Sequence, residues 1–160
     1  MKMIRIGHAW DTHKLVSGRK LILGGIEVKS ELGLLGHSDA DVVLHAVAES
    51  FLGALALGDL GTFYPDNSDK TLNMDSKIIL KECYNKVRVA SYHVNNIDLT
   101  IYSEKIKINP IREDIRKSIA DLLNLKLDQV SVKATTYEGM SFIGRSEALA
   151  CEAVCLIEND

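Results

Sequence analysis

The sequence predicts an α+β fold of two layers, in which one mixed β-sheet carries helices on one face. The length of 160 residues is that of one ordinary domain. Segments with strand-like composition open and close the chain and recur in its middle, and segments with helical periodicity lie between them. Strands and helices in this order are typical of helices packed against a sheet. We therefore expect a single domain over residues 1–160.

The first residues of the chain predict a strand and a hairpin. Met3–His8 is apolar and β-branched enough for a strand. Lys20–Leu23 and Ile26–Val28 are two further apolar runs. The pair of glycines between these runs indicates a tight turn, so we expect them to form a hairpin.

A first helix is predicted to follow. Ser38 and Asp41 have the spacing of a capping box, in which a serine and an acid three residues later satisfy the first amides of a helix. Gly58 marks its end. The apolar residues between recur at helical spacing: Val42, Leu44, Val47, Ala48, Phe51, Leu52 and Leu55. Asp59–Asp75 carries glycine, proline and many polar residues and predicts a long loop, which in a compact domain is often functional.

The second half of the chain predicts two helices and three strands. A helix is expected over Ser76–Ala90, and another after Asn109, where a proline stands at its first position. Val130–Thr136 and Leu149–Ile157 predict the closing strands. The central strand shows alternating apolar residues, namely Ile97, Leu99 and Ile101. We expect these three residues or their alternates to form an uncovered apolar sheet face, which a second copy of the chain would bury.

Composition limits the class of partner. The net charge of −3 gives no broad positive surface, so we expect neither nucleic acid nor an anionic membrane to bind. There is no apolar run of 18 residues and no signal-peptide pattern, so we expect a soluble, cytoplasmic protein. Three cysteines are too few for a disulfide framework and are expected to be reduced thiols.

Three residues have the chemistry of a metal site. Asp11 and His13 are two positions apart, so in an extended segment both side chains point the same way. His45 lies on the first predicted helix, where Asp41, His45 and Glu49 step by four and share one face. Two histidines and a carboxylate are a familiar set of zinc ligands that leaves a fourth position open. The alternative is that Asp11 and His13 form a hydrogen-bonded turn and that His45 is an ordinary surface residue.

Two other segments could contact an anion. A glycine-rich loop leads through His37 and Ser38 into a helix N-terminus, where free amides favour negative charge. Lys133–Gly139 offers two threonines and Glu138 at the end of a strand. Each residue also has a simpler explanation, because Ser38 could only cap the helix and the threonines could be ordinary strand residues.

Together these segments resemble one enzyme family, the 2-C-methyl-D-erythritol 2,4-cyclodiphosphate synthases of the non-mevalonate isoprenoid route. The resemblance covers nearly the whole chain. None of the positions at which the chain departs from the family pattern is an expected zinc ligand. The matching blocks are Arg5–His13, Gly33–Asp41 with His45, Gly58–Gly61 with Tyr64–Asp66, Val132–Gly139 and Phe142–Arg145.

The resemblance implies a role for each matching residue. Asp11, His13 and His45 would bind one zinc ion per subunit, and Glu138 a magnesium or manganese ion on the substrate diphosphate. His37 and Thr136 would stabilise the transition state. The positions that would contact the substrate are Asp11, His13, His37, Ser38, Asp59, Gly61, Tyr64, Pro65, Asp66, Asn67, Ser68, Ser103, Lys107, Asn109, Thr135, Thr136, Glu138, Phe142 and Arg145.

The resemblance also implies the assembly and the reaction. The family is a homotrimer around a three-fold axis, with sites between subunits. A central cavity lined by Phe142 and Arg145 would accept phosphate or an isoprenoid diphosphate. The substrate's 2-phosphate would attack its own β-phosphate and release CMP. Two alternatives are a zinc phosphohydrolase, with Asp41 or Glu49 as base, and a trimeric protein that only binds isoprenoid diphosphates.

Overall fold

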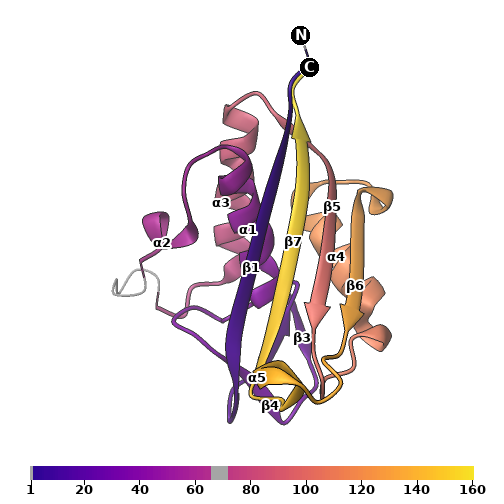
Figure 1. Ribbon diagram of the computed structural model, residues 1–160. Coiled ribbons are helices and arrows are strands. Elements are labelled where there is room, and N and C mark those ends of the chain that lie inside the picture. Colours follow the sequence, from indigo (N-terminus) through magenta and orange to yellow (C-terminus); the bar gives the residue numbers. More distant parts are fainter. Residues whose placement is uncertain (1, 66–71) are drawn as a thin grey trace.

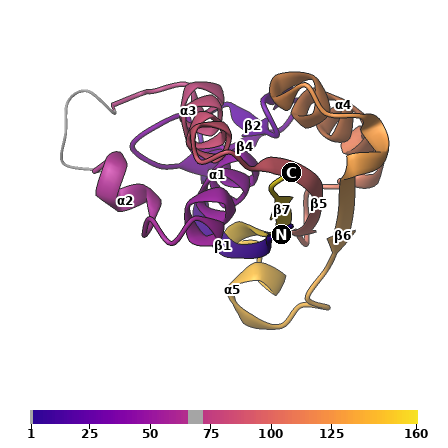
Figure 2. The ribbon, with the colours of Figure 1, turned by 90° about the horizontal axis from the view of Figure 1, so that it is seen from above.

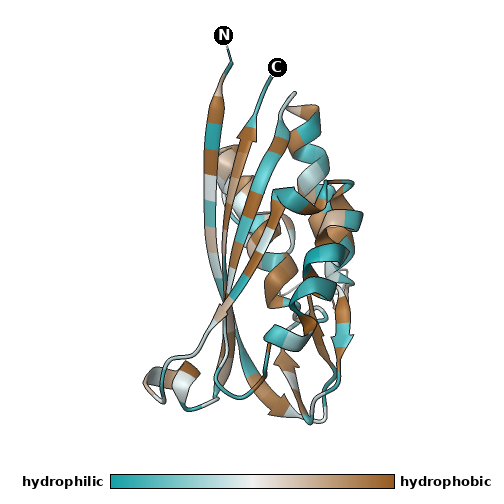
Figure 3. Ribbon diagram, turned by 90° about the vertical axis from the view of Figure 1, so that its right-hand side faces the viewer, coloured by the Kyte–Doolittle hydropathy of each residue, from teal (hydrophilic) through white to brown (hydrophobic). Residues whose placement is uncertain are grey.

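A mixed five-stranded sheet forms one layer of the molecule, and the long helices pack on one of its faces (Figures 1 and 3). The structure, a computed structural model, describes residues 2–65 and 72–160. The strand order is β4-β1-β7-β5-β6, and β5 and β6 are the one parallel pair among these neighbours. Viewed along the strands, α1, α3 and α4 lie on the same side of the sheet, whereas the short α5 lies on the other (Figure 2). The predicted fold class is confirmed.

The strands of the main sheet are β1 (Ile4–Ser17), β4 (Leu32–Leu35), β5 (His93–Tyr102), β6 (Val130–Thr135) and β7 (Ala148–Glu158). The predicted hairpin is confirmed as β2 (Leu21–Leu23) and β3 (Ile26–Val28). The helices are α1 (Val42–Ala54), α2 (Leu60–Phe63), α3 (Ser76–Val89), α4 (Arg112–Leu123) and α5 (Ser141–Gly144), with 3₁₀ turns at Asn109–Ile111 and Leu127–Gln129.

Three predictions of where elements lie were wrong. β1 does not end at His8 but continues to Ser17, because it pairs first with β7 and then with β4. β4 lies where the sequence predicted only a glycine-rich loop. A Cβ at Gly33 would lie 2.3 Å from the Arg19 carbonyl oxygen, so this glycine permits a close backbone approach. The predicted loop over Asp59–Asp75 contains α2, which at four residues is too short to show periodicity.

Helix α1 lies against the centre of the sheet, and most of its side chains are buried. Its backbone comes unusually close to β1. A Cβ atom at Gly7 would lie 1.8 Å from the Ser50 carbonyl oxygen, a distance that real atoms do not adopt. The glycine therefore sets the separation of helix and strand, and this separation fixes how far His45 lies from the side chains of β1.

The N-terminus of α1 is capped by Asp41 and not by the predicted capping box. The Asp41 carboxylate accepts hydrogen bonds from the backbone N–H groups of Val43 and Leu44, both at 3.1 Å. It also accepts from Gly24 at 2.9 Å and Gly25 at 2.6 Å, which form the β2–β3 turn. Burial raises the pKa of Asp41 to about 6, although these N–H donors act in the opposite direction. One buried carboxylate therefore joins the hairpin to the helix.

The face of the sheet opposite the helices carries apolar side chains that nothing in the described chain covers. Ile97, Leu99 and Ile101 are buried beneath the helices, and their outward alternates on β5, Asp98 and Thr100, are polar. The prediction that this strand carries the uncovered apolar face was therefore wrong. Ile4 and Ile6 on β1 are 59% and 68% exposed, and Trp10 and Val154 lie on the same face. Exposed apolar side chains grouped on one sheet face are typical of a protein–protein interface.

The Asp41 contacts lead to a stability prediction. Asp41→Ala leaves four backbone N–H groups without their acceptor, so we expect the free energy of unfolding to fall by about 3 kcal/mol. Urea denaturation measures this change. The control is Asp121→Ala, which removes only an exposed ion pair with Lys117 and should cost less than about 0.5 kcal/mol. Equal losses in the two variants would contradict the role given to Asp41.

Candidate metal centre

Asp11, His13 and His45 meet at one point between β1 and α1. The Asp11 Oδ2 atom lies 3.2 Å from His13 Nε2 and 3.1 Å from His45 Nδ1, and the two histidine nitrogens are 3.3 Å apart. A tetrahedral zinc ion with bonds of about 2.0–2.1 Å requires ligand atoms roughly 3.3 Å apart. The donor set and its spacing therefore fit a divalent metal, and the predicted i, i+2 arrangement of Asp11 and His13 is confirmed.

The two histidines are oriented by hydrogen bonds from their other ring nitrogens. His13 Nδ1 lies 3.0 Å from the carbonyl oxygen of Leu35 on β4, and with its proton there it donates to that oxygen. His45 Nε2 lies 2.8 Å from Ser76 Oγ, and the Ser76 hydroxyl donates in turn to the Asp39 carboxylate. When the ring is neutral, the nitrogen that faces the cluster is therefore the one without a proton and can bind a metal. Such partners fix the tautomer of a metal-binding histidine and its ring orientation.

The charges of the cluster are coupled. Burial raises the pKa of Asp11, but hydrogen bonds from His13 and His45 outweigh burial and hold this pKa well below its usual range. Burial lowers the pKa of His13, whereas the hydrogen bond and negative charge of Asp11 raise it by more. The metal-free cluster therefore favours an ionised carboxylate beside a protonated imidazole. A metal ion must displace that proton, so metal binding should weaken as the pH falls.

A cavity of about 580 Å³ opens beside the three ligands. His37 and Ser38 line it from the loop before α1, and Glu49 lines it from α1 itself. On the other side it is lined by Gly61, Tyr64 and Pro65 from α2 and the residues that follow. The Tyr64 hydroxyl donates a hydrogen bond to Glu82 of α3 at 2.5 Å, which ties this wall to the helix layer.

Most of the expected residues in the first half of the chain are therefore brought together. Asp59 is the exception among the described ones, because it caps α2 and does not line the cavity. Its carboxylate accepts from the backbone and the hydroxyl of Thr62, at 2.9 and 2.8 Å. The predicted contacts Asp66, Asn67 and Ser68 lie outside the described residues.

The expected residues in the second half lie at and beyond the ends of β5 and β6, which are two and three strands away from β1, and none of them lines the 580 Å³ cavity. Ser103 donates its backbone N–H to the carbonyl of Thr135, which joins the two strand ends. Lys107 lines a separate cavity of about 450 Å³ together with residues 28–32. Asn109, Thr136 and Glu138 are exposed nearby in the chain.

Phe142 lies on α5 and Arg145 directly follows it, beyond the end of β6. Both side chains are exposed. Arg145 forms an ion pair with Glu147, with Nε and Oε1 2.7 Å apart. An arginine with an internal acidic partner does not by itself require an anionic ligand.

Sequence reasoning missed Ser76 as the partner of His45, and Asp39 as the partner of Ser76. Asp39 stands inside the motif that was singled out, but its spacing alone indicates no particular partner. Ser76 lies 31 positions from His45 and is the first residue of α3, where the sequence indicated only a helix start. The packing of α3 on α1 brings these residues together.

The Ser76 contact can be tested by metal affinity. Ser76→Ala removes the nearer of two hydroxyl oxygens beside His45 Nε2 and leaves Ser38 Oγ at 3.2 Å, so we expect the affinity for zinc to fall by about tenfold. Competition with a chromophoric chelator measures this affinity. Ser118→Ala on α4 removes a serine far from the cluster and is the matched control. Unchanged affinity in a folded Ser76→Ala protein would show that Ser76 does not position the ligand.

The sequence matches the model of the YgbB family over residues 4–158. A curated relative from Carboxydothermus hydrogenoformans, named 2-C-methyl-D-erythritol 2,4-cyclodiphosphate synthase, is 49% identical over 98% of this chain and 96% of its own length. A relative of the same name from Leptospira interrogans is 49% identical, with 98% of each chain covered.

Solved structures agree with this match. The bifunctional IspDF from Campylobacter jejuni superposes with a TM-score of 0.96 at 34% identity, and the match covers 100% of this chain but only 43% of that one. IspF from Plasmodium falciparum, solved as a CDP complex, gives a TM-score of 0.85 at 34% identity over 96% and 95% of the two chains. Because the family match and these relatives span nearly the whole chain, this protein belongs to the YgbB family.

Proposed function

We propose that the chain is a 2-C-methyl-D-erythritol 2,4-cyclodiphosphate synthase. The reaction converts 4-diphosphocytidyl-2-C-methyl-D-erythritol 2-phosphate into the 2,4-cyclodiphosphate and releases CMP, within the non-mevalonate isoprenoid route. The observation that carries the proposal is the Asp11–His13–His45 cluster, set in a cavity of a chain whose curated relatives bear this enzyme name. The proposed unit is one synthase domain over residues 1–160, acting in the cytoplasm.

The chemistry asks for positioning and charge neutralisation. The attacking group is a phosphate of the substrate itself, which is already ionised at pH 7 and needs no general base. The protein must fold the substrate back on itself and hold the two phosphates together. When bound, zinc at the Asp11 cluster and magnesium or manganese at Glu138 would supply positive charge to the diphosphate.

The described residues divide the binding task into two halves. Around the metal cluster, His37 and Ser38 can donate hydrogen bonds to phosphate oxygens, and Asp59, Gly61, Tyr64 and Pro65 are assigned to the erythritol side. At the ends of β5 and β6, Ser103, Lys107 and Asn109 are assigned to cytidine. Thr135, Thr136 and Glu138 are assigned to the diphosphate. We assign transition-state stabilisation to His37 and Thr136.

A homotrimer would unite these two halves. They lie at separate places on one chain, and the outer sheet face with Ile4, Ile6 and Trp10 is apolar and uncovered. Three copies packed on this face around an axis would bury it. They would also place the metal half of one subunit beside the cytidine half of the next. Phe142 and Arg145 would line the central cavity, with phosphate or an isoprenoid diphosphate as the proposed occupant.

Hydrolysis is the competing reaction, with a metal-bound water in place of the 2-phosphate. Asp41 is a poor base for it, because its carboxylate is buried and already accepts four backbone hydrogen bonds. Glu49 lines the cavity, but its carboxylate accepts a hydrogen bond from the Leu60 N–H. The contacts of Asp41 therefore count against hydrolysis.

The reaction itself is the direct test. Incubation with the cytidine diphosphate substrate and magnesium in ¹⁸O-water should release CMP, and chromatography measures this release. Mass spectrometry of the cyclic product should find no solvent oxygen, since cyclisation uses only substrate atoms. His45→Ala should lose most bound zinc and most of this activity. An ¹⁸O-labelled, uncyclised product would instead indicate a phosphohydrolase.

Complementation tests the shared site. His45→Ala and Lys107→Glu should each be nearly inactive alone. The two variants are then refolded together in equal amounts. A site is intact when its metal half comes from a Lys107→Glu chain and its cytidine half comes from a His45→Ala chain. Random mixing gives each condition a chance of about one half, so about a quarter of the sites should recover.

Each variant refolded alone is the control, and mass-tagged chains confirm that subunits have exchanged. Activity that stays at background after confirmed exchange would mean that each site lies within a single chain.

A further inference from the structure

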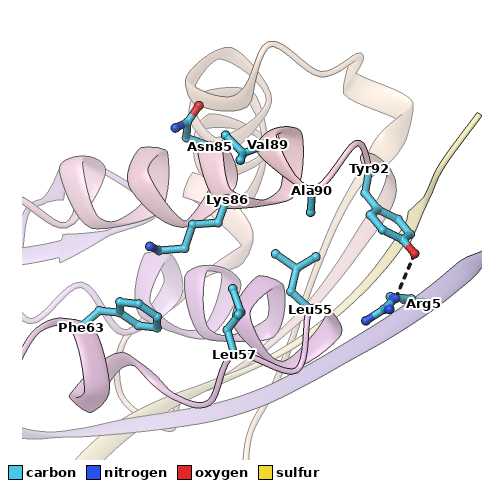
Figure 4. Close-up of a pocket in the computed structure, with 9 residues that line it drawn as sticks. All are labelled: Arg5, Leu55, Leu57, Phe63, Asn85, Lys86, Val89, Ala90 and Tyr92. Atoms are coloured by element: carbon cyan, nitrogen blue, oxygen red, sulfur yellow. Dashed lines mark hydrogen bonds between the residues drawn. The ribbon is translucent and has the colours of Figure 1, made fainter.

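A second cavity, of about 680 Å³, lies beside α2 (Figure 4). It is bounded by the C-terminal ends of α1 and α3, by α2 and by the start of β1. None of the residues that line it also lines the cavity beside the metal ligands. Its volume lies within the range of small-molecule sites, which is about 300–1,000 Å³.

The middle of this cavity is apolar. Leu55 and Leu57 project into it from the end of α1 and the residues after it, between Phe63 of α2 and the end of α3 (Figure 4). Leu57 is 43% exposed, and Val89 at the end of α3 is 78% exposed. Apolar side chains gathered in a hollow can each bury more surface if a hydrocarbon chain lies against them.

One end of the cavity carries an arginine held in place by the fold. Arg5 Nε donates to the Tyr92 hydroxyl at 3.1 Å, and Arg5 Nη1 donates to the Ala54 carbonyl at 3.3 Å. Across residues 2–65 and 72–160, no carboxylate forms an ion pair with Arg5, and Nη2 has no hydrogen-bond acceptor. The Tyr92 hydroxyl accepts from Arg5, so its own proton is available to a ligand. An arginine and a hydroxyl side by side suit a phosphate group.

The other end carries a second cation. Lys86 Nζ lies 4.2 Å from the centre of the Phe63 ring, and within the described part of the chain it has no acidic partner. Figure 4 places Lys86 and Arg5 at opposite sides of the leucine floor. The cavity therefore combines an apolar floor with positive charge and no negative side chain in its lining.

We propose that this cavity is a binding site for a small amphipathic anion, an aliphatic chain that ends in a phosphate group. The phosphate binds Arg5 Nη2 and the Tyr92 hydroxyl, and the chain lies across Leu57 toward Phe63. Capping of α1 accounts for the contact of Arg5 with Ala54. Capping does not account for the exposed Leu57 and Val89 in the same cavity, or for Lys86, which has no acidic partner among the described residues.

The site would communicate with the metal centre through α2. Phe63 faces the second cavity, whereas Leu60 and Gly61 of the same helix line the first. A ligand that contacts Phe63 therefore acts on a wall of the cavity beside Asp11 and His13. By linkage, if this ligand changes the affinity of the metal-side cavity for substrate, substrate changes the affinity of the second cavity for this ligand by the same factor.

Hexyl phosphate is the probe that tests this site, measured by isothermal titration calorimetry on the full chain. In an Arg145→Ala background, which removes the phosphate partner proposed for the central cavity, we expect one equivalent to bind per chain, at least about tenfold more tightly than inorganic phosphate or hexanol. Val89→Glu places a carboxylate in the cavity and should weaken binding at least about tenfold. Ile78→Glu makes the same kind of change on the same helix at a position that is 48% exposed and outside the cavity, and it should bind normally.

Further variants separate this site from the metal centre. Tyr92→Phe removes the hydroxyl but keeps the ring beside Arg5 and should weaken binding about three- to tenfold. His45→Ala should retain full affinity for hexyl phosphate, so this result stands whether or not the proposed reaction is confirmed. Equal binding by Val89→Glu and Ile78→Glu would overturn the proposal. So would equal affinity for hexyl phosphate and inorganic phosphate, or no binding at all.

Discussion

The close contact between β1 and α1 is the constraint on which the metal centre depends. Gly7 has no side chain, so the backbone of α1 at Ser50 can lie directly against the strand. The three ligand atoms of Asp11, His13 and His45 then fall within 3.1–3.3 Å of one another. Even a methyl group at position 7 would force the helix outward and enlarge this triangle beyond what one ion can span. Asp41 fixes the position of the N-terminus of α1, because it holds that end of the helix against the β2–β3 turn.

The helix layer supports the site from behind. Helix α3 contributes the Ser76 hydroxyl to His45 from its first turn and Glu82 to Tyr64 from its second. A polar cluster in a protein interior is stable only when each buried group has a partner, and no buried side-chain nitrogen or oxygen of the described residues lacks one. The metal ligands are thus held in place by elements that carry no ligand themselves.

Among the described residues, no helix has both the length and the apolar character needed to cross a bilayer.

Periodicity predicted the elements that bury one face and failed where strand pairing decides the structure. The helices with regular apolar spacing, α1, α3 and α4, were found, and Gly24 and Gly25 indicated the hairpin. The second half of β1 was missed because its sequence from Trp10 to Lys14 is mostly polar, and it is extended only because β7 and β4 pair with it. In the site, spacing alone brought Asp11 and His13 together. Ser76 reaches His45 through tertiary packing, for which one sequence contains no local signal.

The two ends of the chain meet, and this arrangement has a consequence for biosynthesis. The first strand pairs with the last along the middle of the sheet, and Met3 and Asn159 exchange hydrogen bonds at its tip (Figure 1). Within this domain β1 is synthesised first and β7 last, so Asp11 and His13 leave the ribosome long before β7 can pair with their strand. Contacts between such distant residues form slowly. The nascent domain therefore carries an unpaired strand edge until β7 has been made, and the metal centre is among the last parts of the domain to become ordered.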